Sequence, residues 1–124
     1  MIATKQCTPK NSLVLISGSS AGEIPASMSG KLVVATPSCI AVGTLSEFDG
    51  ETSITLTDEQ QPMCIDNELH VVFTGHLETQ NQEVSVRNVL DESILTMSTK
   101  SKLSEVQICA NDNSEPNKLI IIVK

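Results

Sequence analysis

CIAVGTLSEF-DG-ETSITLTD, residues 39–58, is the stretch that decides the fold class. Apolar residues alternate with small or hydroxyl-bearing residues on both sides of Asp49-Gly50, which is typical of strands with one buried face. An Asp-Gly pair supplies the positive φ angles of a type I′ turn, whose twist matches that of paired strands. The segment therefore predicts a β-hairpin with Asp49-Gly50 at its tip.

A two-residue loop also sets the register of this hairpin and the side of the sheet that each residue faces. The predicted pairs are Phe48 with Glu51, Leu45 with Ile54 and Gly43 with Leu56. The face expected to contact the core holds Ala41, Gly43, Leu45, Ile54 and Leu56. The opposite face holds Thr44, Ser46, Phe48, Ser53, Thr55 and Thr57. This hydroxyl-rich face is expected to be solvated, with a binding surface as the alternative.

Similar short runs recur along the chain, separated by Gly, Pro, Asn, Asp and Ser. The runs are 12–17, 31–36, 38–48, 51–57, 63–65, 69–77, 83–90, 93–98, 104–110 and 117–124. They predict one all-β domain over 1–124. Its expected fold is an antiparallel β-sandwich or a jelly-roll-like fold of eight to nine short strands. Residues 1–11 are expected to form an irregular N-terminal segment. Residues 90–106 could start a helix at Asp91, but their Ser and Thr content favours strand.

For two of these runs, the sequence also predicts which side chains are buried. Alternation within 69–77 puts Leu69, Val71, Phe73, Gly75 and Leu77 on one face and His70, Val72, Thr74, His76 and Glu78 on the other. The run LIIIV at 119–123 does not alternate, which suits a strand buried on both faces. Two alternatives remain for it: a central, doubly covered strand, or an outer face that forms a dimer interface, with Lys118 and Lys124 guarding a sheet edge.

The composition excludes several classes of protein. Two Phe are the only aromatic residues, so Val, Ile, Leu and Met must fill the core, and platforms for stacking sugars or single-stranded nucleic acid are missing. The net charge of −7 repels polyphosphate, and it either attracts a basic protein or serves only to keep the protein dispersed in solution. The segment 1–12 has no apolar core of a secretory signal, and 119–123 is too short to span a bilayer. These features predict a cytoplasmic protein that binds neither nucleic acid nor membrane.

The four cysteines are expected to be free thiols in that reducing location. Cys7, Cys39, Cys64 and Cys109 are widely spaced, and no C-x-x-C pair indicates a zinc or redox motif. Cys39, Cys64 and Cys109 lie in apolar runs and are interpreted as small core residues.

Candidate catalytic and metal-binding residues are weak. Gly18-Ser19-Ser20-Ala21-Gly22 matches G-x-S-x-G, but no helix follows to make Ser20 a nucleophile or to bind phosphate, so 17–30 is interpreted as a surface loop. His70 and His76, six residues apart on one strand, are too distant to share a metal ion and are expected to be solvated. The oxygen-rich groups are Asn111, Asp112, Asn113 and Glu115, and Asp58, Glu59, Asp66 and Glu68 around Pro62. Both groups lack calcium-loop spacing and are interpreted as turns.

No catalytic, cofactor-binding or metal-binding residue is therefore predicted, and no cofactor is expected. The leading hypothesis is a non-enzymatic protein-interaction module, an acidic inhibitor or immunity-type protein whose partner is a basic toxin or nuclease, or a second copy of itself. A structural subunit of a homo-oligomer is the second hypothesis. The third is a β-barrel or sandwich that binds a small ligand or a metal, or a minor enzyme that uses the 17–30 loop.

Overall fold

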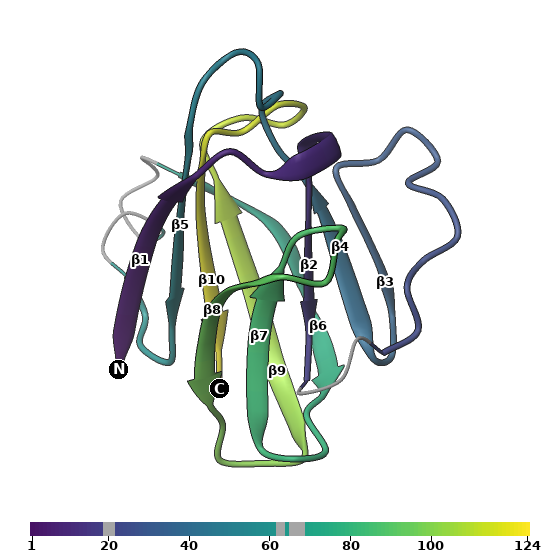
Figure 1. Cartoon of the computed structure of the whole chain (residues 1–124). Coiled ribbons are helices and arrows are strands. Elements are labelled where there is room, and N and C mark those ends of the chain that lie inside the picture. Colours follow the sequence, from purple (N-terminus) through teal and green to yellow (C-terminus); the bar gives the residue numbers. More distant parts are fainter. Residues whose placement is uncertain (19–21, 62–63, 65–68) are drawn as a thin grey trace.

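The computed structural model describes residues 1–18, 22–61, 64 and 69–124, and it shows a β-sandwich of two five-stranded sheets (Figure 1). The first sheet has the order β1-β5-β10-β9-β6 and the second β3-β4-β2-β7-β8. All neighbouring strands are antiparallel except β5 and β10, which are parallel. The strands are β1 Ile2–Cys7, β2 Leu13–Ser17, β3 Val33–Thr36, β4 Cys39–Gly43, β5 Thr52–Thr57, β6 His70–Glu78, β7 Glu83–Arg87, β8 Ser93–Ser98, β9 Leu103–Ala110 and β10 Lys118–Val123, and a 3-10 turn, η1, covers Lys10–Ser12.

The all-β sandwich is confirmed, with ten strands instead of eight or nine. The expectation that 1–11 is irregular is wrong, because Ile2–Cys7 forms edge strand β1 beside β5. This strand is largely exposed and polar, so it lacks the apolar alternation that marks the others. Residues 90–106 form β8 and β9, as expected, and the strand expected at 63–65 lies outside the described residues except for Cys64. No helix in the described part of the chain has the length and hydropathy that a membrane crossing requires.

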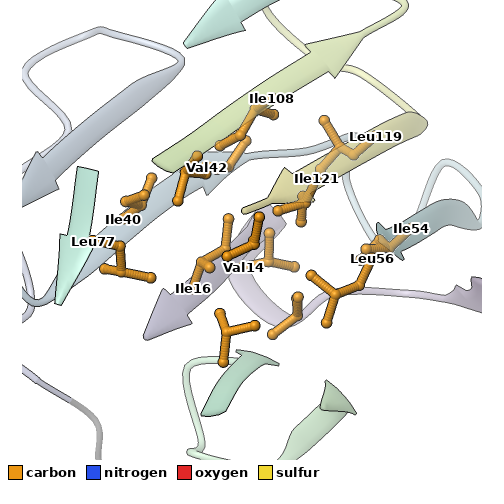
Figure 2. Close-up of a cluster of buried hydrophobic side chains, with 14 of the residues drawn as sticks. Val14, Ile16, Ile40, Val42, Ile54, Leu56, Leu77, Ile108, Leu119 and Ile121 are labelled. Atoms are coloured by element: carbon orange, nitrogen blue, oxygen red, sulfur yellow. The ribbon is translucent and has the colours of Figure 1, made fainter. Parts of the chain in front are cut away.

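The main core lies between the two sheets, and Figure 2 shows aliphatic side chains from both sheets pointing toward one another. One sheet contributes Val14 and Ile16 from β2 and Ile40 and Val42 from β4. The other contributes residues of β5, β6, β9 and β10, all essentially inaccessible to water: Ile54, Leu56, Leu77, Ile108, Leu119 and Ile121. Burying a side chain of this size stabilises the fold by roughly 1.5–3 kcal/mol, so aliphatic residues suffice without Trp or Tyr.

The predicted hairpin at Asp49-Gly50 is wrong. β4 and β5 belong to different sheets, and residues 44–51 cross from one sheet to the other. Ile54 pairs with Lys5 and Leu119, not with Leu45, whose amide instead donates to the carbonyl of Pro116 at 2.9 Å. Of the Asp-Gly pair only Gly50 has a positive φ, at 146°, so no type I′ turn forms.

The predicted core face of that hairpin is wrong for β4 and correct for β5. Ile40 and Val42 face the main core, while Ala41 lies in a second cluster on the outer side of its sheet. β4 is buried on both faces because the segment that contains Met28 covers that outer side, so alternation could not reveal which face is inward. The single hydroxyl-rich face predicted across the two strands does not exist.

A β-bulge changes the predicted faces of β6. Val71 pairs with Cys109 and Phe73 with the next residue of β9, Ile108, so Val72 is inserted without a partner. The extra residue reverses the alternation, as bulges do. Leu69 therefore packs on the outer side of the sheet and Phe73 packs against the main core, although the sequence placed them on one face.

The apolar run in β10 is a central strand covered on both faces. Leu119, Ile121 and Val123 join the main core, whereas Ile120 and Ile122 join an outer cluster with Leu69 and Cys109. Ile120 is 4% exposed and Ile122 is 2% exposed within a single chain. The alternative in which the outer face of this strand forms a dimer interface is therefore wrong, because the chain itself covers it.

We expect Ile120→Lys to lower the free energy of unfolding by more than about 3 kcal/mol, because it buries an ammonium group without a partner. Leu103→Lys on β9 is the matched control, since Leu103 is 58% exposed, and it should change the stability by less than about 0.5 kcal/mol. Urea denaturation measures both. A fully stable Ile120→Lys protein would contradict this placement of β10.

Candidate protein-binding site

Two loops meet at one end of the sandwich. Residues 44–51 connect β4 to β5, residues 111–117 connect β9 to β10, and both project from the upper end in Figure 1. The amide of Leu45 donates to the carbonyl of Pro116 at 2.9 Å, and the amide of Ser53 donates to the carbonyl of Asn117 at 2.8 Å. The two loops therefore form one continuous surface, which we call the acidic end.

Charge is concentrated at the acidic end. The two loops contain five of the 15 acidic residues, Glu47, Asp49, Glu51, Asp112 and Glu115, and none of the eight Lys and Arg. All but Glu47 are exposed. Lys10 of η1 is a nearby cation, and its Nζ lies 4.0 Å from Oε2 of Glu47. An exposed ion pair of this length contributes little, so the two loops keep an excess of negative charge.

Phe48 protrudes from the middle of this negative surface. Its side chain is 89% exposed, the highest value among the large hydrophobic residues that the structure describes. A turn holds it there, in which the amide of Asp49 donates to the carbonyl of Ser46 at 2.9 Å and the amide of Phe48 donates to Oγ of Ser46 at 3.3 Å. An aromatic ring held in water by a closed turn is typical of the anchor residues of protein interfaces.

The second loop is held in shape by its own side chains. One carboxylate oxygen of Asp112 accepts hydrogen bonds from the amide of Glu115 at 2.8 Å and from the amide and hydroxyl of Ser114 at 3.0 Å. The amide oxygen of Asn111 accepts from the backbone of Asn117 and Lys118 at 3.1 Å. A preformed loop loses less conformational entropy when it binds, which favours recognition.

These hydrogen bonds also affect the ionisation of Asp112. The amide of Glu115, followed by the amide and hydroxyl of Ser114, holds the pKa of the Asp112 carboxyl below its ordinary value. Nearby His70 adds a smaller effect in the same direction. The acidic end therefore keeps this charge under mildly acidic conditions.

We expect the amide signals of Ser114 and Glu115 to report this ionisation in an NMR titration. Because the folded pKa is lowered, the loop contacts are fully present above the ordinary Asp pKa and are lost as the pH falls through the lowered value. Both signals should therefore move with a midpoint below 3.8. Asp112→Asn is the control, and it should remove this transition while leaving the fold intact. A midpoint at or above 3.8 would contradict the described contacts.

The structure does not assemble the other residues considered from sequence into a site. Ser20 lies outside the described residues, while Gly18 is buried, and its carbonyl accepts a hydrogen bond from Arg87. His70 and His76 are both exposed and remain far apart along β6, and Nε2 of His70 lies 2.5 Å from Oδ1 of Asn113. Within the described ranges, no three His, Cys, Asp or Glu side chains gather closely enough to hold a metal ion.

The two oxygen-rich groups have structural roles where they can be seen. In the 111–115 group, the side chains of Asn111 and Asp112 bond within their own loop, as the turn interpretation expected. In the other group, the carboxylate of Asp58 pairs with the amino group of Met1 at 2.7 Å. Pro62, Asp66 and Glu68 of that group lie outside the described residues.

Sequence reasoning missed the acidic end as a unit. It placed Phe48 on one face of a hairpin and treated 111–116 as an ordinary loop. The contact between the two loops joins residues about 70 positions apart through backbone hydrogen bonds, and such contacts leave no local pattern. One signal was available: Phe48 is a large aromatic residue with an acid on either side, at a turn where no core contact was predicted.

The fold and the acidic end define the molecule as a single β-sandwich with one strongly charged, aromatic-tipped end. No family model matches the sequence, and no curated protein matches it. Two solved structures are similar in fold. ComJ from Bacillus subtilis, an inhibitor of the DNA degrading activity of NucA, is 9% identical, with a TM-score of 0.71 over 99% of this chain and 97% of that chain. The product of crocagin biosynthetic gene J is 7% identical, with a TM-score of 0.55 over 98% and 94% of the two chains.

Proposed function

We propose that this protein is a non-enzymatic inhibitor, of the immunity type, that uses its acidic end to bind and block a basic enzyme, with a nuclease as the leading candidate. The observation that carries the proposal is the position of Phe48 amid five acidic residues on two loops joined by backbone hydrogen bonds. The similarity in fold to an inhibitor of a DNA-degrading enzyme supports the same class of function.

Each part of the acidic end has a physical role in this proposal. Nucleases bind phosphates through Lys and Arg, so an acidic protein surface is attracted to the groove that DNA occupies. Unpaired carboxylates raise the rate of encounter with a positive surface. Phe48 then enters an apolar pocket of the partner and slows dissociation. The fixed shape of the 111–117 loop reduces the entropy lost on binding.

The hypothesis of a small-ligand site is also supported by a specific observation, a hollow in the surface. The fold also occurs in the product of crocagin biosynthetic gene J, so it is not confined to nuclease inhibitors. A hollow of about 260 Å³ lies beside the acidic end, lined by residues of η1, the 28–32 segment and Asn113–Ser114. Ligand pockets typically measure roughly 300–1,000 Å³, so this hollow would hold only a small polar molecule.

The decisive experiment uses the gene's own neighbourhood. If a nuclease or toxin is encoded beside this protein, we expect an equimolar amount of the protein to abolish DNA degradation by that purified enzyme. Gel electrophoresis of plasmid DNA measures the inhibition, and bovine serum albumin at the same concentration is the acidic-protein control. A neighbourhood of biosynthetic genes, or a neighbouring nuclease that stays fully active, would overturn the proposal.

Variants of the acidic end should weaken binding to that enzyme in two distinct ways. Phe48→Ala should lower the affinity at least about 30-fold, mainly through faster dissociation, because it removes the anchor. The triple change Glu47→Gln, Asp49→Asn and Glu51→Gln should slow association and flatten its dependence on salt. Surface plasmon resonance at two salt concentrations separates the two effects.

Matched controls come from the opposite end of the sandwich. Leu103→Ala removes a hydrophobic side chain that is 58% exposed on β9. The triple change Glu59→Gln, Glu78→Gln and Glu105→Gln removes the same number of carboxylates, all of them exposed. Both controls should bind like the unmodified protein within about twofold. Equal losses in the controls and the test variants would show that net charge or general stability, and not the acidic end, governs binding.

A further inference from the structure

The outer side of the first sheet contains two cysteines that the proposed function does not use. Cys109 lies on β9 and is completely buried in a cluster with Leu69, Ile120 and Ile122. Cys64 lies in the connection between β5 and β6, is half-buried, and packs against the same cluster. Residues far apart in the sequence therefore bring two thiols to one apolar patch.

The two thiols are neighbours in this cluster. Burial, and then the neighbouring Cys64 thiol, raises the pKa of the Cys109 thiol, so Cys109 keeps its proton. Neither sulfur is in a disulfide in this structure. Because they share this cluster, the two side chains are near each other, and Cys64, the more exposed of the two, is the one that a reagent in solution reaches first.

The remaining cysteines, Cys7 and Cys39, are not placed to form a disulfide with Cys64 or Cys109. Cys7 packs at the margin of the main core, and Cys39 is buried in the cluster on the outer side of the other sheet. The three apolar clusters are separate, so each of these thiols lies apart from the Cys64–Cys109 pair. An intramolecular disulfide can therefore form at only one place without rearranging the sandwich.

We propose that Cys64 and Cys109 form a disulfide when the protein meets a small-molecule disulfide such as oxidised glutathione, and that this bond ties Cys64 to the outer face of β9.

The reaction is thiol–disulfide exchange in two steps. The Cys64 thiolate attacks one sulfur of oxidised glutathione, which forms a mixed disulfide and releases one glutathione thiolate. The Cys109 sulfur, on losing its proton, then attacks the Cys64 sulfur and displaces the second glutathione. Two protein thiols are oxidised, one glutathione disulfide is reduced to two thiols, and the protons of Cys64 and Cys109 end on the released glutathiones.

The test uses the full chain with the other two cysteines removed, as Cys7→Ser and Cys39→Ala together. After incubation with oxidised glutathione, we expect a monomer whose mass has fallen by about 2 Da and whose denatured thiol count has fallen from two to zero. Tryptic peptides 32–87 and 103–118 should then appear joined until a reductant is added. An unchanged thiol count, or disulfide-linked dimers on a non-reducing gel, would overturn the proposal.

A further pair of variants in this background assigns the two steps. With Cys109→Ala the exchange should stop at the mixed disulfide, which leaves a mass gain of about 305 Da on Cys64. With Cys64→Ser the buried Cys109 should stay reduced and the mass should not change. Rapid glutathione addition to Cys109 in that last variant would show that the proposed order is wrong. Circular dichroism confirms folding, and if either variant is unfolded, the peptide map of the parent protein still decides the pairing.

Discussion

Water must be kept from both faces of β10, and much of the architecture follows from that requirement. Leu119, Ile121 and Val123 on one face contact the opposite sheet, which supplies a core of Val and Ile side chains. Ile120 and Ile122 on the other face need a second cover, to which Leu69 and Cys64 contribute. The strand can meet both demands only in the middle of its sheet, between β5 and β9. Each of these five buried side chains adds roughly 1.5–3 kcal/mol of apolar stabilisation.

The acidic end is a by-product of this arrangement. Because β10 occupies the place beside β5, β4 cannot pair with β5, and the chain from 44 to 51 must pass from one sheet to the other. That passage runs beside the turn that leads into β10. A backbone hydrogen bond from Leu45 joins the two loops, and one from Ser53 at the start of β5 lies next to it. Phe48 belongs to none of the three apolar clusters of the described residues, and its ring is exposed to solvent. A rigid scaffold with variable loops at its end is the usual way in which β-sandwiches acquire binding sites.

The parts of this structure that sequence could predict are those with a local pattern. Burial of both faces of β10 follows from five consecutive apolar residues, and β8 and β9 follow from strand-forming residues in 90–106. Alternation around Asp49-Gly50 correctly predicted two strands. It indicates only that each strand has a buried face, and it does not identify the strand with which each one pairs. Ile54 and Leu56 would be buried in a hairpin and are equally buried when the chain crosses between sheets, so their pattern does not distinguish the two arrangements. The bulge at Val72, the meeting of the two acidic loops and the proximity of Cys64 to Cys109 all depend on long-range pairing, which no local spacing encodes.

The parallel pairing of β5 with β10 also affects how the protein folds during its synthesis. The second sheet uses only strands from the segment 13–98, so all of its strands have been synthesised before β9 and β10 are made. The first sheet has a vacant place between β5 and β9 until β10 emerges from the ribosome. Closing that place joins regions about 65 residues apart, which is entropically costly and slow. During this interval the exposed edges of β5 and β9 can pair with other nascent chains, so the rate at which β10 inserts sets how much of the protein is lost to aggregation.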